Sequence, residues 1–180
     1  MNKMLFIGLA LIATAISAVE STRLNAPAKW SSFKTDSGIE TRFSFRNDSH
    51  YLYLKVICSE PEMKNLKTGG KVHDVDVWKE DNLEIFLNPV REGKIFAQFA
   101  VGPSGTMYDA RIDDMVRDPK WNPQGIEATP FRENSAWGIE LKIPISLFVS
   151  LLSDPKEKKK INADSWSFNK IGRASCRERV

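Results

Sequence analysis

Short segments in which apolar and polar residues alternate recur along this chain, and turn residues separate them. Alternation places successive side chains on opposite faces of a strand, so one face can cover a core while the other meets solvent. Alternating strands spaced by turns are typical of antiparallel sheets. The segments with the clearest apolar face lie around Phe43, Leu54, Ile85 and Ile139.

This pattern predicts an all-β domain. We expect strands at residues 39–45, 51–58, 82–87, 95–101, 107–112, 126–131, 136–143 and 165–169, and one short helix or turn at 145–152. The first two strands should form a hairpin, and we place 95–101 beside 82–87. We find no long amphipathic helix and no repeat of fixed period. The predicted fold is therefore an antiparallel β-sandwich, two packed sheets of the jelly-roll or immunoglobulin-like kind.

The first residues are typical of an export signal. Lys3 gives a positive start, residues 5–16 are almost wholly apolar, and Ala18 is the small residue that a signal peptidase requires. We predict a signal peptide at 1–18, cleaved after Ala18, and a mature protein that is secreted or periplasmic. The apolar run is shorter than the roughly 20 residues of a membrane-spanning helix, so we expect no membrane insertion.

Residues 171–180 differ in composition from the rest of the chain and resemble a translated sequencing-library adapter. We therefore interpret this tail as an artefact and exclude it from fold reasoning. The domain is expected to occupy residues 19–170 and to be truncated at its C-terminus. The strand predicted at 165–169 would then be cut short.

The charge balance argues against a nucleic-acid partner. The predicted signal holds one of the 26 basic residues, and the tail holds three more with one of the 23 acidic residues, which leaves 22 of each. A formally neutral domain gives no support for nucleic acid, which requires a clustered basic face. The basic run Lys156 to Lys160, with Glu157 inside it, is the exception, and we interpret it as a solvated loop before the last strand in preference to a polyanion site. Cys58 is then the remaining cysteine of the domain, so no disulfide can form, and we expect Cys58 to be a small buried hydrophobe.

The candidate binding site begins at Trp78, which stands with Glu80 and Asp81 directly before the strand at 82–87. Glu84 lies opposite Leu83 in the alternation and should point away from the core. A tryptophan ring can stack on the apolar face of a pyranose while a nearby carboxylate accepts hydrogen bonds from its hydroxyls. Trp78 and Glu84 therefore predict a sugar-binding loop.

Three further residues are candidates for the same site. Gln98 lies on the strand placed beside 82–87, where its amide could donate to and accept from sugar hydroxyls. Arg111 could add a charged donor from the next strand, and Trp121, between two prolines, could supply a second stacking ring. Each also has a structural interpretation. Trp78 could pack against the protein instead of binding a ligand, and Trp121 could pack within its own loop. Glu84 could be an ordinary solvated carboxylate. For Trp30, Trp137 and Trp166, packing in the core is favoured.

Residues 39–170 resemble the carbohydrate-binding family 9-like modules, within a wider DOMON-like superfamily of secreted sandwich domains that bind sugars or haem. The segments that carry this resemblance are Tyr51-Leu52-Tyr53-Leu54-Lys55-Val56, Trp78 with Asp81-Asn82-Leu83-Glu84-Ile85-Phe86-Leu87, Phe96-Ala97-Gln98-Phe99-Ala100-Val101, Gly105, Trp137-Gly138-Ile139-Glu140-Leu141-Lys142-Ile143-Pro144, and Trp166-Ser167-Phe168-Asn169.

The resemblance implies a non-catalytic module that binds an oligo- or polysaccharide, often as an accessory to a glycoside hydrolase in polysaccharide breakdown. Sugar-binding members clamp a terminal sugar between two tryptophans, and Trp78 and Glu84 match the first clamp tryptophan and its acidic neighbour. The second tryptophan would lie where this sequence is interrupted. Some members bind calcium, for which Asp74, Asp76 and Asp81 could offer oxygen ligands, although their spacing matches no complete loop motif and we assign no metal.

Three other functions stay open at the level of the sequence. An enzyme would need a catalytic pair or nucleophile, and no nucleophile elbow, zinc-binding histidine motif or phosphate loop is present. A haem-binding module of the same superfamily would need axial ligands, for which the candidates are His50, His73, Met63, Met107 and Met115. A structural cell-surface module would bind no sugar at all.

Overall fold

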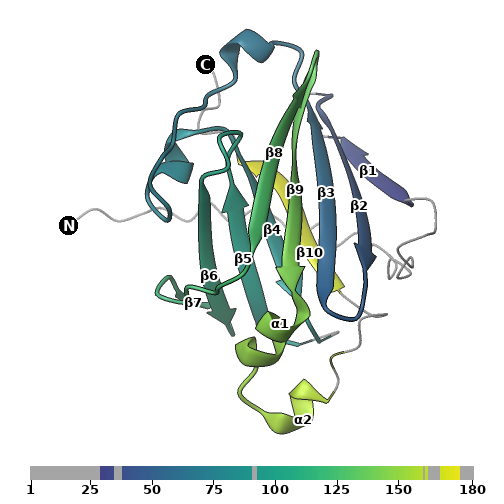
Figure 1. Ribbon diagram of the computed structural model, residues 1–180, viewed down its shortest axis with the longest axis vertical. Helices are drawn as coiled ribbons and strands as arrows, with labels where there is room; N and C mark the ends of the chain where they lie inside the picture. The colour runs from purple at the N-terminus through teal and green to yellow at the C-terminus, as the bar shows by residue number, and fades with distance from the viewer. Residues whose placement is uncertain (1–28, 35–37, 91–92, 160, 162–166, 175–180) are drawn as a thin grey trace.

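The computed structural model describes residues 29–34, 38–90, 93–159, 161 and 167–174. Two layers of antiparallel strands face each other, with short helical segments at their ends (Figure 1). The strands are β1 (Trp30–Lys34), β2 (Glu40–Asn47), β3 (Tyr51–Ser59), β4 (Asn82–Asn88), β5 (Ile95–Val101), β6 (Met107–Asp113), β7 (Val116–Asp118), β8 (Glu127–Glu133), β9 (Ala136–Pro144) and β10 (Ser167–Ala174). The helical segments are η1 (Met63–Asn65), η2 (Asp76–Lys79), α1 (Ile145–Leu151) and α2 (Pro155–Lys158).

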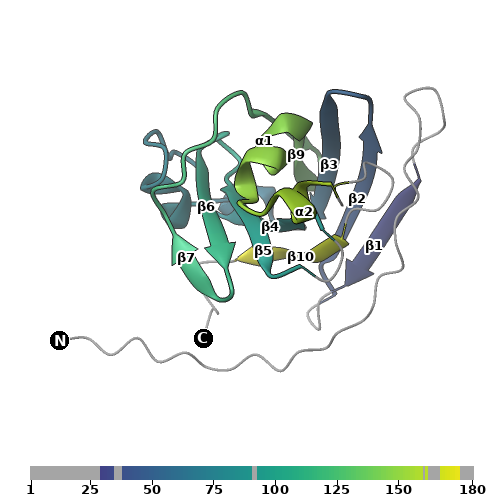
Figure 2. The same cartoon turned by 90° about the horizontal axis from the view of Figure 1, so that it is seen from below.

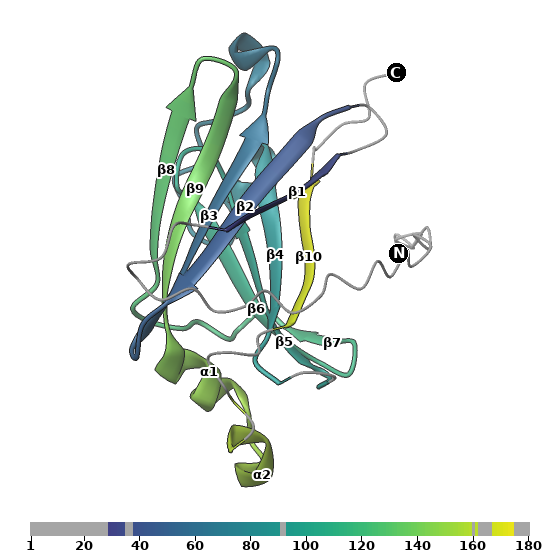
Figure 3. The ribbon, with the colours of Figure 1, turned by 90° about the vertical axis from the view of Figure 1, so that its right-hand side faces the viewer.

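The strand order confirms the predicted β-sandwich. One sheet has the order β1-β2-β3-β9-β8 and the other the order β10-β4-β5-β6-β7, and every neighbouring pair is antiparallel. The predicted hairpin is β2 with β3, and β5 lies beside β4 as expected. Figure 3 shows the two sheets from the side.

The core lies between the sheets because one face of each central strand is apolar. On β3 and β9 the register pairs Leu54 with Leu141 and Val56 with Ile139, and all four side chains are buried. The facing row of the other sheet runs from Ile85 on β4 to Phe99 on β5. Cys58 is buried, as predicted.

One end of the sandwich is closed by α1, which Figure 2 shows from below. Its residues Leu147, Phe148 and Leu151 are buried in the core. Pro144 precedes the helix in an extended conformation and so ends β9. The loop that holds η1 and η2 lies at the opposite end (Figure 1).

Several predicted boundaries differ from the structure. The sequence pattern missed β1 and β7, and residues 156–158 of the run interpreted as a solvated loop lie in α2. β10 crosses the predicted domain boundary, because the backbone of residues 171–174 pairs with β4. The predicted signal peptide and residues 175–180 lie outside the described residues. Within the described part of the chain, no helix combines the length and the apolar character needed to cross a membrane.

Candidate functional site

Trp78 lies in the η2 turn, on the outer face of the β10-β4-β5-β6-β7 sheet. Its neighbour Val77 is completely buried against Ala100, Tyr108 and Ala110, which anchors the turn to β5 and β6. The Trp78 ring is half-buried and packs on Tyr108, with ring centroids 5.1 Å apart and planes tilted by 59°. One part of the Trp78 ring therefore packs on Tyr108, while another part meets solvent.

The acidic residues that follow Trp78 point inward. Glu80 and Asp81 are both buried, and each carboxylate accepts hydrogen bonds from loop residues. Asp81 accepts from the backbone N–H of Lys67 at 2.9 Å, and Glu80 accepts from Ser104. These carboxylates hold the loop in place and do not face solvent.

Glu84 does face outward, as the alternation predicted. It pairs with Ala100 on β5, and Ala100 pairs with Tyr108 on β6, so the three residues form one row across the outer face. Neighbouring strands are about 4.8 Å apart, which separates the backbones of Glu84 and Tyr108 by about 10 Å. Because Val77 covers Ala100, Glu84 flanks the same turn that carries Trp78.

Gln98 lies on this outer face, in the adjacent row between Phe86 and Ala110. Its side chain is completely buried, and among the described residues neither of its amide atoms has a hydrogen-bond partner. The amide therefore does not reach the surface in this structure. Buried amides are usually hydrogen-bonded, and that of Gln98 is an exception among the described residues.

Arg111 and Trp121 lie on the other face of the sheet, away from Trp78 and Glu84. Arg111 donates from Nε to the carbonyl of Leu151 at 3.1 Å and pairs with Asp113 at 2.8 Å, so it joins β6 to the end of α1. The Trp121 ring is partly buried and lies 6.1 Å from that of Phe99, on the core side of β5. The five predicted residues therefore form two groups on opposite faces.

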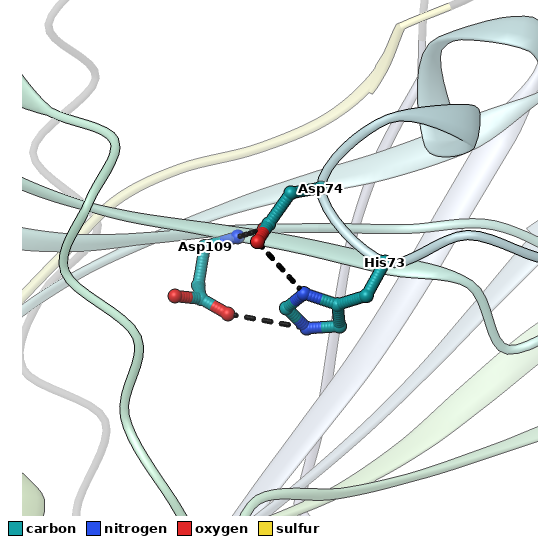
Figure 4. Close-up of side chains that lie close together, drawn as sticks. All are labelled: His73, Asp74 and Asp109. Atoms are coloured by element: carbon teal, nitrogen blue, oxygen red, sulfur yellow. Dashed lines mark hydrogen bonds and ion pairs between the residues drawn. The ribbon is translucent and has the colours of Figure 1, made fainter.

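A polar cluster that the sequence pattern did not identify lies beside this region. His73, Asp74 and Asp109 approach one another at the edge of β6 (Figure 4). His73 Nδ1 is 3.0 Å from Asp74 Oδ2, and His73 Nε2 is 3.3 Å from Asp109 Oδ2. One sequence signal was available, since alternation along β6 puts the acidic Asp109 on the same face as the buried Met107.

Burial dominates the electrostatics of the cluster. It raises the pKa of Asp109 to about 6, an effect that the charge of Asp74 strengthens and that of His73 opposes. The pKa of Tyr108 is also raised, chiefly by burial, with smaller contributions of the same sign from Asp74 and Asp109 and an opposing one from Arg117. The cluster and the Trp78–Tyr108 pair are therefore close enough to interact electrostatically.

A shallow groove of about 490 Å³ crosses the outer face of the other sheet, between β1 and β8. Its lining includes Trp30, Tyr53 and two ion pairs, Lys55–Glu140 at 2.7 Å and Lys142–Glu127 at 2.8 Å. Core packing was favoured for Trp30 and is wrong, because the residue is 43% exposed, at the edge strand β1. Core packing is confirmed for Trp137, which is completely buried, while Trp166 lies outside the described residues.

The residues considered for calcium and haem lie in separate surroundings. The three aspartates named for calcium contact different groups: Asp74 contacts His73, Asp76 accepts from the backbone of residues 71 and 72, and Asp81 accepts from Lys67. His50 lies in the β2–β3 turn, where its ring bonds to Ser49. That turn and the His73 loop occupy opposite ends of the sandwich (Figure 1).

No protein-family model and no curated protein matches this sequence. Among solved structures, a "putative carbohydrate-binding protein" from Bacteroides uniformis superimposes with a TM-score of 0.57 at 12% identity, over 71% of this chain and 65% of that one. The two proteins share a fold. Family 9 carbohydrate-binding modules from Caldicellulosiruptor kristjanssonii are also among the neighbours, with bound glucose (TM-score 0.48, 13% identity) and with bound cellotriose (0.47, 14%). They align with 66% of this chain, which spans 58% and 57% of their lengths.

Proposed function

We propose that this domain binds carbohydrate and that Trp78 is its stacking surface. The observation that carries the proposal is the half-exposed Trp78 ring, which Tyr108 holds on the outer face beside Glu84. Val77 packs against Ala100, Tyr108 and Ala110 and so fixes the turn on this face, which positions the Trp78 ring before a ligand arrives. A pre-positioned ring loses little conformational entropy on binding, which favours affinity.

The chemistry of the region fits a sugar. A pyranose presents apolar C–H groups on one face and hydroxyls at its rim, which requires an aromatic ring and hydrogen-bond acceptors within reach of each other. Trp78 supplies the ring, and Glu84 supplies an acceptor on the same surface. The fold shared with the Bacteroides uniformis protein supports this function.

The remaining parts of the proposal rest on the sequence. We propose a module without catalytic activity of its own, exported after cleavage near Ala18 and acting in polysaccharide breakdown as an accessory to a glycoside hydrolase. The residues described here offer no argument for haem, and we keep the oligo- or polysaccharide as the ligand.

A glycan-array and affinity-electrophoresis screen of protein starting at Val19 tests this function. We expect saturable binding to at least one plant, algal or microbial glycan, and Trp78→Ala should weaken it at least tenfold, about 1.4 kcal/mol. Trp30→Ala is the matched control, because this second exposed tryptophan lies in the groove of the other sheet. Far-UV circular dichroism should show that both variants are folded.

Two results would overturn the proposal. Wild-type protein that binds no glycan would exclude carbohydrate binding and favour a structural module. Binding that is lost in the Trp30 variant and kept in the Trp78 variant would move the site to the groove of the β1-β2-β3-β9-β8 sheet.

A further inference from the structure

The cluster of His73, Asp74 and Asp109 forms along the part of the β6 edge that is not paired with β7. The short strand β7 pairs with residues 111–113 of β6, and the loop before η2 covers the preceding residues instead. The N–H of Asp74 donates to the carbonyl of Met107 at 2.9 Å, and Asp74 Oδ1 accepts from the N–H of Asp109 at 3.4 Å. Asp74 is therefore tied to β6 through both its backbone and its side chain.

Asp109 is a buried carboxylate that lies 3.3 Å from His73 Nε2 but accepts no hydrogen bond from the described residues. On the core face, Ile85 of β4 pairs with Phe99 of β5, and Phe99 pairs with Asp109 of β6. Asp109 is 1% exposed. Within the described chain no group donates a hydrogen bond to either of its oxygens, whereas the buried Glu80 and Asp81 each have donors. A buried charge is costly unless a cation or several donors accompany it.

The orientation of His73 suits metal binding. Asp74 Oδ2 lies 3.0 Å from Nδ1 and can accept a hydrogen bond from its N–H, which leaves Nε2, 3.3 Å from Asp109 Oδ2, available as a metal ligand (Figure 4). A carboxylate on one nitrogen of an imidazole, with a metal on the other, is the usual way in which proteins orient metal-binding histidines. Asp74 has a positive φ of 65°, in the left-handed region that aspartate adopts more readily than most residues.

We propose that His73 Nε2 and the Asp109 carboxylate bind a divalent transition-metal cation, with Asp74 as the positioning residue. Zinc bonds of about 2.0–2.2 Å to nitrogen and oxygen at a tetrahedral angle separate two ligand atoms by about 3.4 Å. The observed separation of Nε2 and Oδ2 is 3.3 Å. One atom from each of the three residues lies within 4.8 Å of the others, so the cation would lie near both carboxylates.

The ligand set also selects the kind of cation. Imidazole nitrogen favours zinc and its first-row neighbours, whereas calcium and magnesium prefer all-oxygen sites. The two carboxylates supply negative charge, and the 43% exposure of the His73 side chain gives a cation access from solvent. Water would fill the remaining positions.

Titration of the full chain with the metal ions alone tests the site, after removal of bound metal with a chelator. We expect isothermal titration calorimetry at pH 7.5 to show saturable Zn²⁺ binding. Co²⁺ should give visible absorption bands that Zn²⁺ abolishes, and Ca²⁺ should not compete. His73→Gln and Asp109→Asn should each weaken Zn²⁺ binding by more than tenfold, and Asp74→Asn should weaken it by 10- to 100-fold.

His50→Gln is the matched control, because His50 is the chain's other histidine and lies at the opposite end of the sandwich. It should bind Zn²⁺ as the wild type does. Asp109→Asn removes a buried charge and should stay folded, so a loss of binding there cannot be attributed to unfolding. Binding that is equal in the wild type and in Asp109→Asn, or no binding of Zn²⁺ and Co²⁺ at millimolar concentration, would overturn the site. His73 would then be an ion-pair partner of the two aspartates.

Discussion

The hydroxyl of Ser104 donates a hydrogen bond of 2.6 Å to the carboxylate of Glu80, which joins the turn between β5 and β6 to the loop that carries Trp78. The backbone N–H of Ser104 donates to the same carboxylate at 3.3 Å. Thr106 bonds to the Ser104 hydroxyl at 2.8 Å and extends the network. Gly70 and Gly102 border the Glu80 carboxylate: a Cβ at Gly70 would collide with it, and a Cβ at Gly102 would make a tight contact.

We expect Glu80→Ala to lower the free energy of unfolding by about 1–2 kcal/mol, because it removes the buried carboxylate that accepts two hydrogen bonds from Ser104. Ser104→Ala should cost about 1 kcal/mol, and the double variant should cost less than the sum of the two. Urea unfolding of the four proteins measures this coupling. Glu133→Ala, at an exposed glutamate of β8, is the control and should stay within about 0.5 kcal/mol of wild type. Additive losses would mean that Glu80 and Ser104 act independently.

A second prediction concerns α1, whose two faces differ in burial. Phe148 is completely buried in the core, whereas its neighbour Val149 is 40% exposed. Phe148→Ala should lower the free energy of unfolding by about 3–5 kcal/mol through the cavity it leaves, and Val149→Ala should have little effect. Similar losses in the two variants, measured by thermal or urea unfolding, would show that α1 does not close the core.

Gly138 provides a third prediction, because β9 passes too close to its neighbours there for a side chain. A Cβ at this position would collide with the carbonyl oxygen of Val56 and with the ring of Phe131. We expect Gly138→Ala to lower the free energy of unfolding by about 2–3 kcal/mol, since backbone oxygen cannot move aside. Removing the ring as well, by Phe131→Ala, should not restore stability. Thr129→Ala on the same sheet is the control, and full rescue by the double variant would identify the ring as the only obstacle.

How far the sequence predicts this fold depends on how much of a strand is buried. β3 and β9 have an uninterrupted apolar face, as Leu54 and Ile139 illustrate, and the alternation predicts both strands. β1 and β7 are edge strands: β1 is at most half-buried and β7 is fully exposed. Neither strand has a face that must be apolar to cover the core, so their sequences need not alternate. Their pairing depends on the neighbouring strands.

The candidate site is less predictable for a related reason. Alternation correctly places Glu84 on the outer face, but it cannot show that the adjacent Glu80 and Asp81 turn inward. That orientation depends on hydrogen bonds to Ser104 and Lys67, which are distant in sequence. The contact of His73 with Asp109 likewise depends on how the loop lies along the free edge of β6.

The last prediction is a pH dependence that originates in Asp109. Its pKa is raised from 3.8 to about 6 in the folded protein, chiefly by burial, so between these values the folded state binds more protons than the unfolded state. The contribution of Asp109 to the free energy of unfolding is therefore present at pH 4 and is lost as the pH rises through 6. The loss amounts to about 3 kcal/mol. Urea unfolding in the presence of a chelator should give wild type and Asp109→Asn similar stabilities at pH 4. The variant should be the more stable protein at pH 7.5, because asparagine carries no charge to bury. A difference between the two proteins that stays constant from pH 4 to pH 7.5 would show that Asp109 titrates normally in the folded state.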